Sequence, residues 1–191
     1  VGGRTNATTV TAAGEVATVT IAADGSQTLS SWRPLTASLS QARAELCAMT
    51  ITPQDTPAAG TDHVVVFTTG RRGNGALSGV AEAGLVGVDG DITTLTTQAT
   101  PNPTRAGAGG FSANGFLFLF GGANGNVSNN DVSTSLVDDT PTLDGWNGLG
   151  GGSMTTARRF PGTAQESAFF FIAGGEATGA VPLTSVEQTV Q

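Results

Sequence analysis

An apolar run that ends in a glycine pair recurs along this chain at a fixed distance, and this repeat constrains the fold more than any other feature. The copies span residues 64–70, 116–122 and 169–175, and residues 1–3 match the end of a further copy. Thr69 replaces the first glycine in the first full copy. The final glycines, Gly70, Gly122 and Gly175, are 52 and then 53 residues apart. A period of this size predicts a repeat protein whose units stack on one another.

The same features surround each copy. An arginine lies upstream, at Arg43, Arg105 and Arg158. A second β-like run lies downstream, at residues 15–21, 80–88, 131–137 and 183–190. Three of these runs are followed by an Asp-Gly pair, which tight antiparallel hairpins favour, at Asp24, Asp89 and Asp144. Trp32 and Trp146 follow two of these turns, and Leu95 follows the third.

These runs predict strands and not helices. No segment has a 3.6-residue apolar periodicity long enough for a helix, and Gly, Asn, Asp and Pro separate the runs. Residues 16–21 alternate as a half-buried strand does, whereas the Val and Phe runs before the glycines do not, which predicts strands buried on both faces. A unit of about 50 residues with four short strands that must stack on its neighbours predicts a propeller blade. The predicted fold class is therefore all-β, with β-propeller blades of four antiparallel strands.

The pattern resembles the kelch repeat, with an arginine before the first strand, a second strand that closes on Gly-Gly, a third strand, and a tryptophan in the last segment. The resemblance is clear in residues 101–154 and clear but shortened in 155–191. It is degenerate in 39–100, where Thr69 breaks the glycine pair and residues 53–61 are inserted. The family's usual tyrosine in the third strand is absent, because the chain contains no Tyr. The resemblance implies a kelch-like propeller.

The repeat frame divides the chain into four units. Residues 1–38 are predicted to form the last strands of one blade, 39–100 a blade with a loop insertion, 101–154 a blade, and 155–191 the first three strands of another. Propellers close with typically four to eight blades, so about three and a half blades predict an incomplete ring. Either the segment belongs to a longer chain or other subunits supply the missing strands. The first alternative is favoured, because natural proteins avoid bare strand edges.

Charge excludes some partners. The formal net charge is −7, and all eight basic residues are arginines, so a surface that collects nucleic-acid phosphates is not expected. No apolar run approaches the roughly 18 residues of a spanning helix, so membrane insertion is not expected either. The expected partners are proteins or other subunits that complete the propeller, or glycans.

No residue is assigned a catalytic, cofactor-binding or metal-binding role. His63 and Cys47 are the only residues of their types, which leaves no set for a zinc site or a Ser-His-Asp triad. His63 is predicted to be a strand-end side chain and Cys47 a core side chain. The glycine-rich segments 107–110 and 148–153 lack the lysine of a P-loop and the strand-then-helix context of a dinucleotide site. They are predicted to be a strand entry and an inter-blade loop.

Three further groups of residues are candidate sites. Oxygen donors crowd residues 124–131 and could hold Ca²⁺, but Asp131 is the only carboxylate there, which favours a tight turn. The other candidate carboxylates lie in different strands or loops, so no glycosidase pair is predicted from Glu45, Glu82, Asp138, Asp139 and Glu187. The three repeated arginines are predicted to share a structural role, hydrogen-bonding strand ends between neighbouring blades, and not to form a binding set.

The function expected from these features is that of a non-catalytic kelch-like propeller module for protein or glycan interaction or extracellular structural assembly. The alternative is a fragment of a secreted carbohydrate-active propeller enzyme whose catalytic residues lie outside this segment. A cluster of Arg and acidic side chains lining one funnel would favour the enzyme, although the interpretation leans against one. The lack of Lys, the pI near 4.4 and the abundance of Thr, Ser and Gly indicate an extracellular or cell-surface location.

Overall fold

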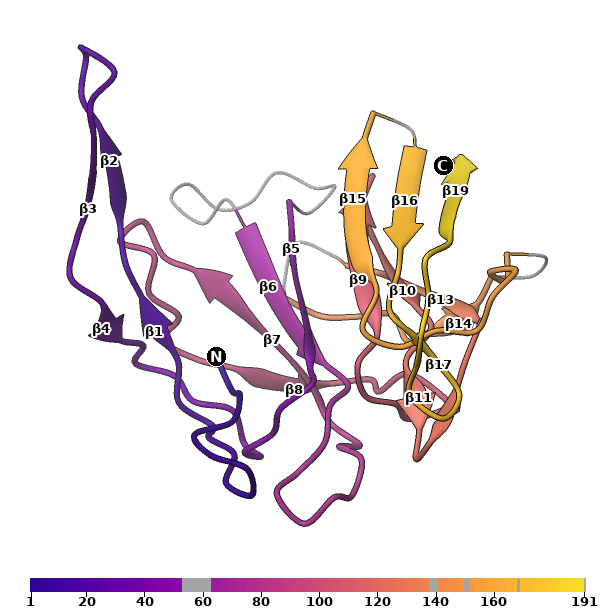
Figure 1. The fold of residues 1–191 in the computed structure, drawn as a ribbon. Helices are drawn as coiled ribbons and strands as arrows, with labels where there is room; N and C mark the ends of the chain where they lie inside the picture. Colours follow the sequence, from indigo (N-terminus) through magenta and orange to yellow (C-terminus); the bar gives the residue numbers. More distant parts are fainter. Residues whose placement is uncertain (53–62, 138–140, 150–151, 168, 191) are drawn as a thin grey trace.

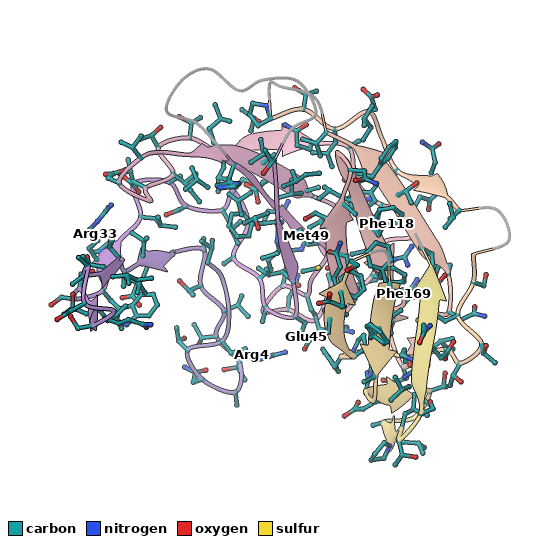
Figure 2. All side chains as sticks on the ribbon, turned by 90° about the horizontal axis from the view of Figure 1, so that it is seen from above. Arg4, Arg33, Glu45, Met49, Phe118 and Phe169 are labelled. Atoms are coloured by element: carbon teal, nitrogen blue, oxygen red, sulfur yellow. The ribbon has the colours of Figure 1, made fainter. Side chains whose placement is uncertain are left out.

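The computed structural model describes residues 1–52, 63–137, 141–149, 152–167 and 169–190. Every regular element in these ranges is a β-strand, and every strand pair is antiparallel. The sheets follow one another along an open arc (Figures 1 and 2). None of the described segments forms a helix that is long and apolar enough to cross a membrane. The prediction of an all-β fold is confirmed.

The first four-stranded sheet, which we call the second blade, has the strand order β5-β6-β7-β8. Its strands are β5 (Cys47–Ile51), β6 (His63–Thr68), β7 (Ala81–Val86) and β8 (Thr96–Gln98). Beyond its first residue, β6 is buried on both faces, as its unbroken valine run predicts. Val64 and Val66 pack toward the following blade, and Val65 and Phe67 pack toward the preceding one. The insertion at residues 53–61 lies outside the described residues.

The third blade repeats this architecture with the order β9-β10-β13-β14. Its strands are β9 (Gly109–Ala113), β10 (Phe116–Phe120), β13 (Val132–Leu136) and β14 (Asn147–Gly148). A small hairpin of β11 (Ala123–Asn124) and β12 (Val127–Ser128) connects β10 to β13. Gly125 adopts a positive φ of 63° between these two strands. The asparagine-rich segment therefore forms the turn that its composition favours.

The two ends of the array carry fewer strands. The fourth blade contains β15 (Gly162–Glu166), β16 (Phe169–Ala173) and β19 (Val186–Val190), with a hairpin of β17 (Glu176–Ala177) and β18 (Val181–Pro182). The first blade contains β1 (Glu15–Val16), β2 (Val19–Ile21), β3 (Gln27–Leu29) and β4 (Arg33–Pro34). In the first blade β1 pairs with β4 and β2 pairs with β3, which makes one long hairpin that protrudes from the array (Figure 1). The described strands form no closed ring.

The apolar core consists of three clusters, one at each junction between consecutive blades. The first junction centres on Ala37, Leu39, Val65, Phe67 and Ile92. The second contains Cys47, Met49, Ile51, Val64, Val66, Ala83, Leu117, Leu119, Val137 and Leu143. The third contains Phe111, Ala113, Phe120, Val132, Met154, Phe170 and Ile172. Each blade is thus stabilised by the next, as repeat architectures require.

Glycines let the inner strands approach closely. A Cβ on Gly109 would lie 2.7 Å from Thr163 Cγ2 in the fourth blade. A Cβ on Gly110 would lie 2.6 Å from Met49 Sδ and 2.7 Å from Cys47 Sγ in the second blade. The glycine-rich segment at 107–110 is therefore the entry to β9, as predicted, and it packs against both neighbouring blades.

Candidate functional site

The repeated arginines are wholly buried, and each guanidinium binds groups of its own blade. Arg43 Nη1 donates to Ser78 Oγ at 3.0 Å, and its Nη2 lies 3.0 Å from Glu82 Oε2. Burial lowers the pKa of Arg43, and the adjacent Glu82 carboxylate opposes that shift. Arg158 donates to the Gly174 carbonyl at 2.8 Å and to Glu187 Oε1 at 2.6 Å. These ion pairs compensate for charges that would be costly to bury alone, although the Nε atoms of Arg43 and Arg158 are buried without a hydrogen-bond partner.

In the third blade, the buried arginine is paired with different residues. Ser133 lies opposite Leu119 in the sheet, as Glu82 lies opposite Phe67 and Glu187 opposite Ile172. Because this position holds a serine, the charge for Arg105 comes from Asp131 Oδ2 at 2.5 Å, and Ser133 Oγ accepts a bond of 3.1 Å. The replacement of the glutamate by Asp131 can be recognised in the sequence only once the strand register is known.

Backbone bonds connect each arginine to the preceding blade. The amides of Gly3, Gly70 and Gly122 donate to the carbonyls of Arg43, Arg105 and Arg158, each at 2.9 Å. At the residues two positions after the arginines, the later blade donates and the earlier blade accepts. The Gly107 amide donates to the Glu45 carbonyl at 2.8 Å, and the Phe160 amide donates to the Gly107 carbonyl at 2.7 Å. The arginine positions therefore do join neighbouring blades, but through their main chain, while their side chains act within one blade.

A charged cluster lies on the concave side of the arc, where Figure 2 labels Arg4 and Glu45. Glu45 Oε1 is 3.0 Å from Arg4 Nη2, and Glu45 Oε2 is 3.2 Å from Arg71 Nε. In the fourth blade Arg159 Nη2 pairs with Glu176 Oε2 at 2.9 Å. Arg4, Glu45 and Arg71 therefore form one ion-paired group that joins the first and second blades.

The other candidate residues lie in surroundings that favour structural roles. Burial raises the pKa of Cys47 to about 12, so the thiol is protonated near neutral pH. His63 lies at the exposed start of β6, 3.2 Å from Thr52 Oγ1. Among the described residues no group of three or more His, Cys, Asp and Glu is placed to hold a metal ion. Asp138 and Asp139 lie outside the described residues, as do Gly150 and Gly151.

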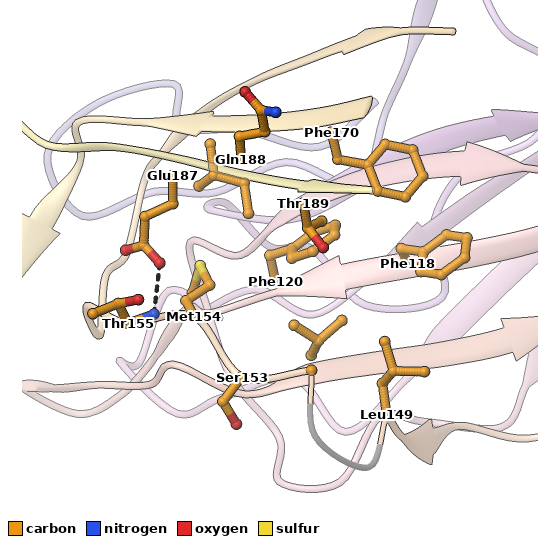
Figure 3. Close-up of a pocket in the computed structure, with 13 residues that line it drawn as sticks. Phe118, Phe120, Leu149, Ser153, Met154, Thr155, Phe170, Glu187, Gln188 and Thr189 are labelled. Carbon is orange, nitrogen blue, oxygen red and sulfur yellow. Dashed lines mark hydrogen bonds between the residues drawn. The ribbon is translucent and has the colours of Figure 1, made fainter. Parts of the chain in front are cut away.

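A cavity of about 340 Å³ opens at the third junction (Figure 3). Its apolar wall includes Phe118 and Phe120 of β10 and Phe170 of β16. Its polar wall includes Gln188 and Thr189 of β19, and the segment before Arg158 closes the remaining side. Phe111 and Phe170 stack beneath it with ring centroids 4.7 Å apart. No pattern in the sequence predicts this cavity.

At the first and second junctions, a side chain from the last segment of a blade occupies the place that corresponds to this cavity. Trp146 packs on the second junction and donates from Nε1 to the Ala99 carbonyl at 3.0 Å. Leu95 occupies the same repeat position and packs on the first junction. Trp32, the third member of this set, is instead 63% exposed.

Comparison with known proteins supports the architecture. A solved structure described as "Structure of YjhT" is similar to this chain with a TM-score of 0.60 and 15% identity, over 84% of this chain and 48% of that one. The chain therefore spans about half the length of that structure. No protein-family model matches the chain, and no curated protein sequence matches it. The likeness concerns the fold alone: this chain is an all-β protein built from β-propeller blades of four antiparallel strands, in an incomplete ring.

Proposed function

We propose that the chain is a non-catalytic kelch-like propeller module that serves protein or glycan interaction or extracellular structural assembly. The observation that carries this proposal is that apolar side chains are exposed at both ends of the array. The repeated arginines are buried within the blades and are therefore not accessible to a partner. Large exposed apolar patches on a folded protein mark contact surfaces. The acidic, lysine-free composition supports the extracellular or cell-surface location that goes with such a role.

At the first end the apolar surface lies on the β2–β3 hairpin. Val19 pairs with Leu29 across the hairpin, and Ile21 follows two residues after Val19, so the three side chains share one face. They are 58%, 59% and 67% exposed in the order Val19, Leu29, Ile21. A hairpin of two strands is marginal in water unless its apolar face is covered.

At the other end the fourth blade exposes the face that a following blade would cover. Phe171 and Phe169 lie four and six residues before the glycine pair ends, as Val66 and Val64 do in the second blade. Phe169 is 38% exposed, but so is Phe116 at the same position of the third blade. The difference lies in the neighbouring inner strand, because all five residues of β15 are exposed, whereas β5 and β9 contain buried residues. The fourth blade thus presents an uncovered junction surface.

The assembly in which the chain occurs in its natural source provides the test. Native mass spectrometry should find the protein in complexes well above the mass of its own polypeptide. Ile21→Ser should release the chain from them, whereas Val88→Ser, at a position that is 89% exposed outside both surfaces, should not. An isolated chain that remains alone at all concentrations in that source would contradict the assembly role.

A second function has one observation in its favour, the cluster of Arg4, Glu45 and Arg71 on the concave side. Such a cluster suits a fragment of a carbohydrate-active enzyme with further residues elsewhere. Release of reducing sugar from glycosides, compared between the protein and its Glu45→Gln variant, distinguishes the two functions. We expect no turnover that depends on Glu45, and Asp89→Asn, which alters an exposed carboxylate paired with Arg33, is the matched control.

A further inference from the structure

We propose that two neighbouring loops on one side of the array form a binding site for a carboxylate-bearing polysaccharide. The loops are residues 4–10 of the first blade and 71–77 of the second, and we call them the arginine loops. This inference rests on the proposed function, because it names the class of glycan that the interaction module binds. The site lies on a surface other than the two apolar ends of the array.

The two arginine loops are in contact with each other. Each begins directly after a glycine, at Arg4 and at Arg71, and a single β-bridge closes it. A Cβ on Gly73 of the second loop would lie 3.3 Å from the Thr8 carbonyl oxygen of the first. Figure 1 shows both loops on the same side of the arc as β11 and β17. Side chains of both loops can therefore reach one ligand.

Positive charge is concentrated in these loops, although the net charge of the chain is −7. The loops contain Arg4, Arg71 and Arg72 and no carboxylate. The adjacent Glu45 pairs with the first two of these arginines. Three cations and one anion leave a local charge of +2, which favours an anionic partner at this place.

Arg72 is the arginine of this group that has no carboxylate. Within the part of the chain that the structure describes, no ion pair joins Arg72 to an acidic residue, whereas Arg4 and Arg71 share Glu45. The Nε of Arg72 is buried without a hydrogen-bond partner, and the residue is half-buried. A partly desolvated guanidinium without a partner is costly, and a carboxylate that binds it through parallel hydrogen bonds removes that cost.

Glu45 orients the other two guanidinium groups from a strained backbone conformation. Its φ is 59°, whereas the same repeat position in the third blade is Gly107, which adopts a φ of 66° without strain. Glu45 Oε1 accepts a bond from Arg4, and Oε2 accepts one from Arg71. The glutamate thus makes two ion pairs that a glycine could not make, and strained backbone of this kind is typical of ligand-binding sites.

The asparagine side chains of the loops present donors and not acceptors. Asn6 Oδ1 accepts the Thr8 and Thr9 amides at 3.0 and 2.8 Å, and Asn74 Oδ1 accepts the Ala76 amide at 3.1 Å. The oxygens are thus used within the loops, and the Nδ2 groups of both exposed asparagines remain as donors. A surface of guanidinium and amide donors is complementary to the carboxylates and hydroxyls of a uronate-containing polysaccharide.

The exposed residues of the arginine loops favour a polysaccharide over a protein partner. Residues 5–9 and 73–76 are all exposed, and they include no aromatic or large aliphatic side chain. Protein interfaces are anchored by such side chains in desolvated pockets. A uronate chain needs only charged and polar contacts, which are the contacts that these loops offer.

Titration of the purified protein with oligogalacturonate tests this site. Calorimetry at low ionic strength should detect binding of oligogalacturonate and none of a neutral galactose oligomer of equal length. The affinity should fall as salt is added, because exposed charges are screened. Arg72→Gln should weaken binding about tenfold or more, the effect of losing one hydrogen-bonded charge pair. Arg33→Gln is the matched control, because it removes the same charge from an arginine that is paired with Asp89 outside the loops, and it should leave the affinity unchanged.

A second pair of variants does not depend on the buried Nε of Arg72. Asn74→Asp keeps the oxygen that accepts the Ala76 amide and places a carboxylate among the arginines, so it should also weaken binding. Asn126→Asp adds the same charge at the exposed turn between β11 and β12, outside the arginine loops, and should not.

The outcomes separate this inference from the proposed function. Equal affinities of the loop variants and their controls, or equally tight binding of polyglutamate, would overturn the inference. If oligogalacturonate does not bind while the natural complexes persist, the inference fails and the proposed function stands. Binding by a protein that forms no natural complexes would instead contradict the assembly role alone.

Discussion

Three residues that follow the buried arginines by two positions hold the main chain in the left-handed region. The φ values are 59° at Glu45, 66° at Gly107 and 52° at Phe160, and these residues form the chain of amide-to-carbonyl bonds between blades. Only glycine adopts this conformation without strain, which costs other residues about 1 kcal/mol or more. The contacts between blades therefore hold Glu45 and Phe160 in a conformation that they would not adopt alone.

Gly107→Ala should destabilise the chain more than its backbone conformation alone implies. A Cβ at this position would lie 2.4 Å from Cε1 of the Phe160 ring. We expect a loss of about 2 to 4 kcal/mol in free energy of unfolding, from backbone strain together with overpacking. Gly25→Ala is the control, because its φ is 83° but nothing lies within 4 Å of its Cβ. Equal losses in urea denaturation would show that the ring contact is unimportant.

Acid should weaken the fourth blade through Glu187. Burial alone would raise the pKa of Glu187, but the amides of Thr155 and Thr156 and the Arg158 guanidinium outweigh it and lower the pKa. A lowered carboxyl pKa contributes stability above the unfolded value, near 4.5, and that contribution is lost as the pH falls through the folded pKa. Unfolding measured from pH 6 to pH 3 should therefore show a loss of stability that is smaller in Glu187→Gln. A variant with the same slope as the parent would contradict this role.

At the scale of the elements, the sequence predicted the strands and the turns well. The glycine-ended runs are β6, β10 and β16, and the valine run is buried on both faces. The runs of β10 and β16 instead each begin with an exposed phenylalanine, followed by buried residues in alternation with partly buried ones. The long β1–β4 hairpin, the cavity and the exposure of Trp32 were not predictable, since they depend on which neighbours each unit has. The residue pattern within one strand does not show whether another blade covers that strand.

The inner strands β5, β9 and β15 depend on small residues, and Gly110→Ala tests this at the second junction. Its Cβ would meet Met49 Sδ and Cys47 Sγ, so the substitution should destabilise the chain by about 1 to 3 kcal/mol. Cys47→Ala removes one of the two sulfur atoms, and the double variant should recover part of the loss. A double-mutant cycle in guanidinium should show a coupling of about 0.5 kcal/mol or more. Additive losses would mean that the strands move apart to admit the methyl group.

At the scale of the whole molecule, the array is most stable in its middle and weakest at its ends. Among the described strands, β7 and β13 have hydrogen-bonded partners on both sides, whereas β19 is paired only with β16. Opening free energies fall where contacts are few and backbone groups are exposed. This gradient follows from the stacking of similar units, in which only the inner units have two neighbours.

Hydrogen exchange should reveal this gradient. Amides of β19 in the dilute chain should exchange at least tenfold faster than those of β7 and β13, because one edge of β19 is open. Exchange that is uniform across the three strands would contradict the open edge.

The bonds between blades also give the array a direction. The carbonyls of Arg43, Arg105 and Arg158 each accept an amide of the earlier blade, and the amides of Gly107 and Phe160 each donate to a carbonyl of the earlier blade. The two ends of the array are therefore chemically different. Like ends cannot substitute for unlike ends in such a structure. A blade inserted in the reverse orientation would consequently leave these amides and carbonyls without partners.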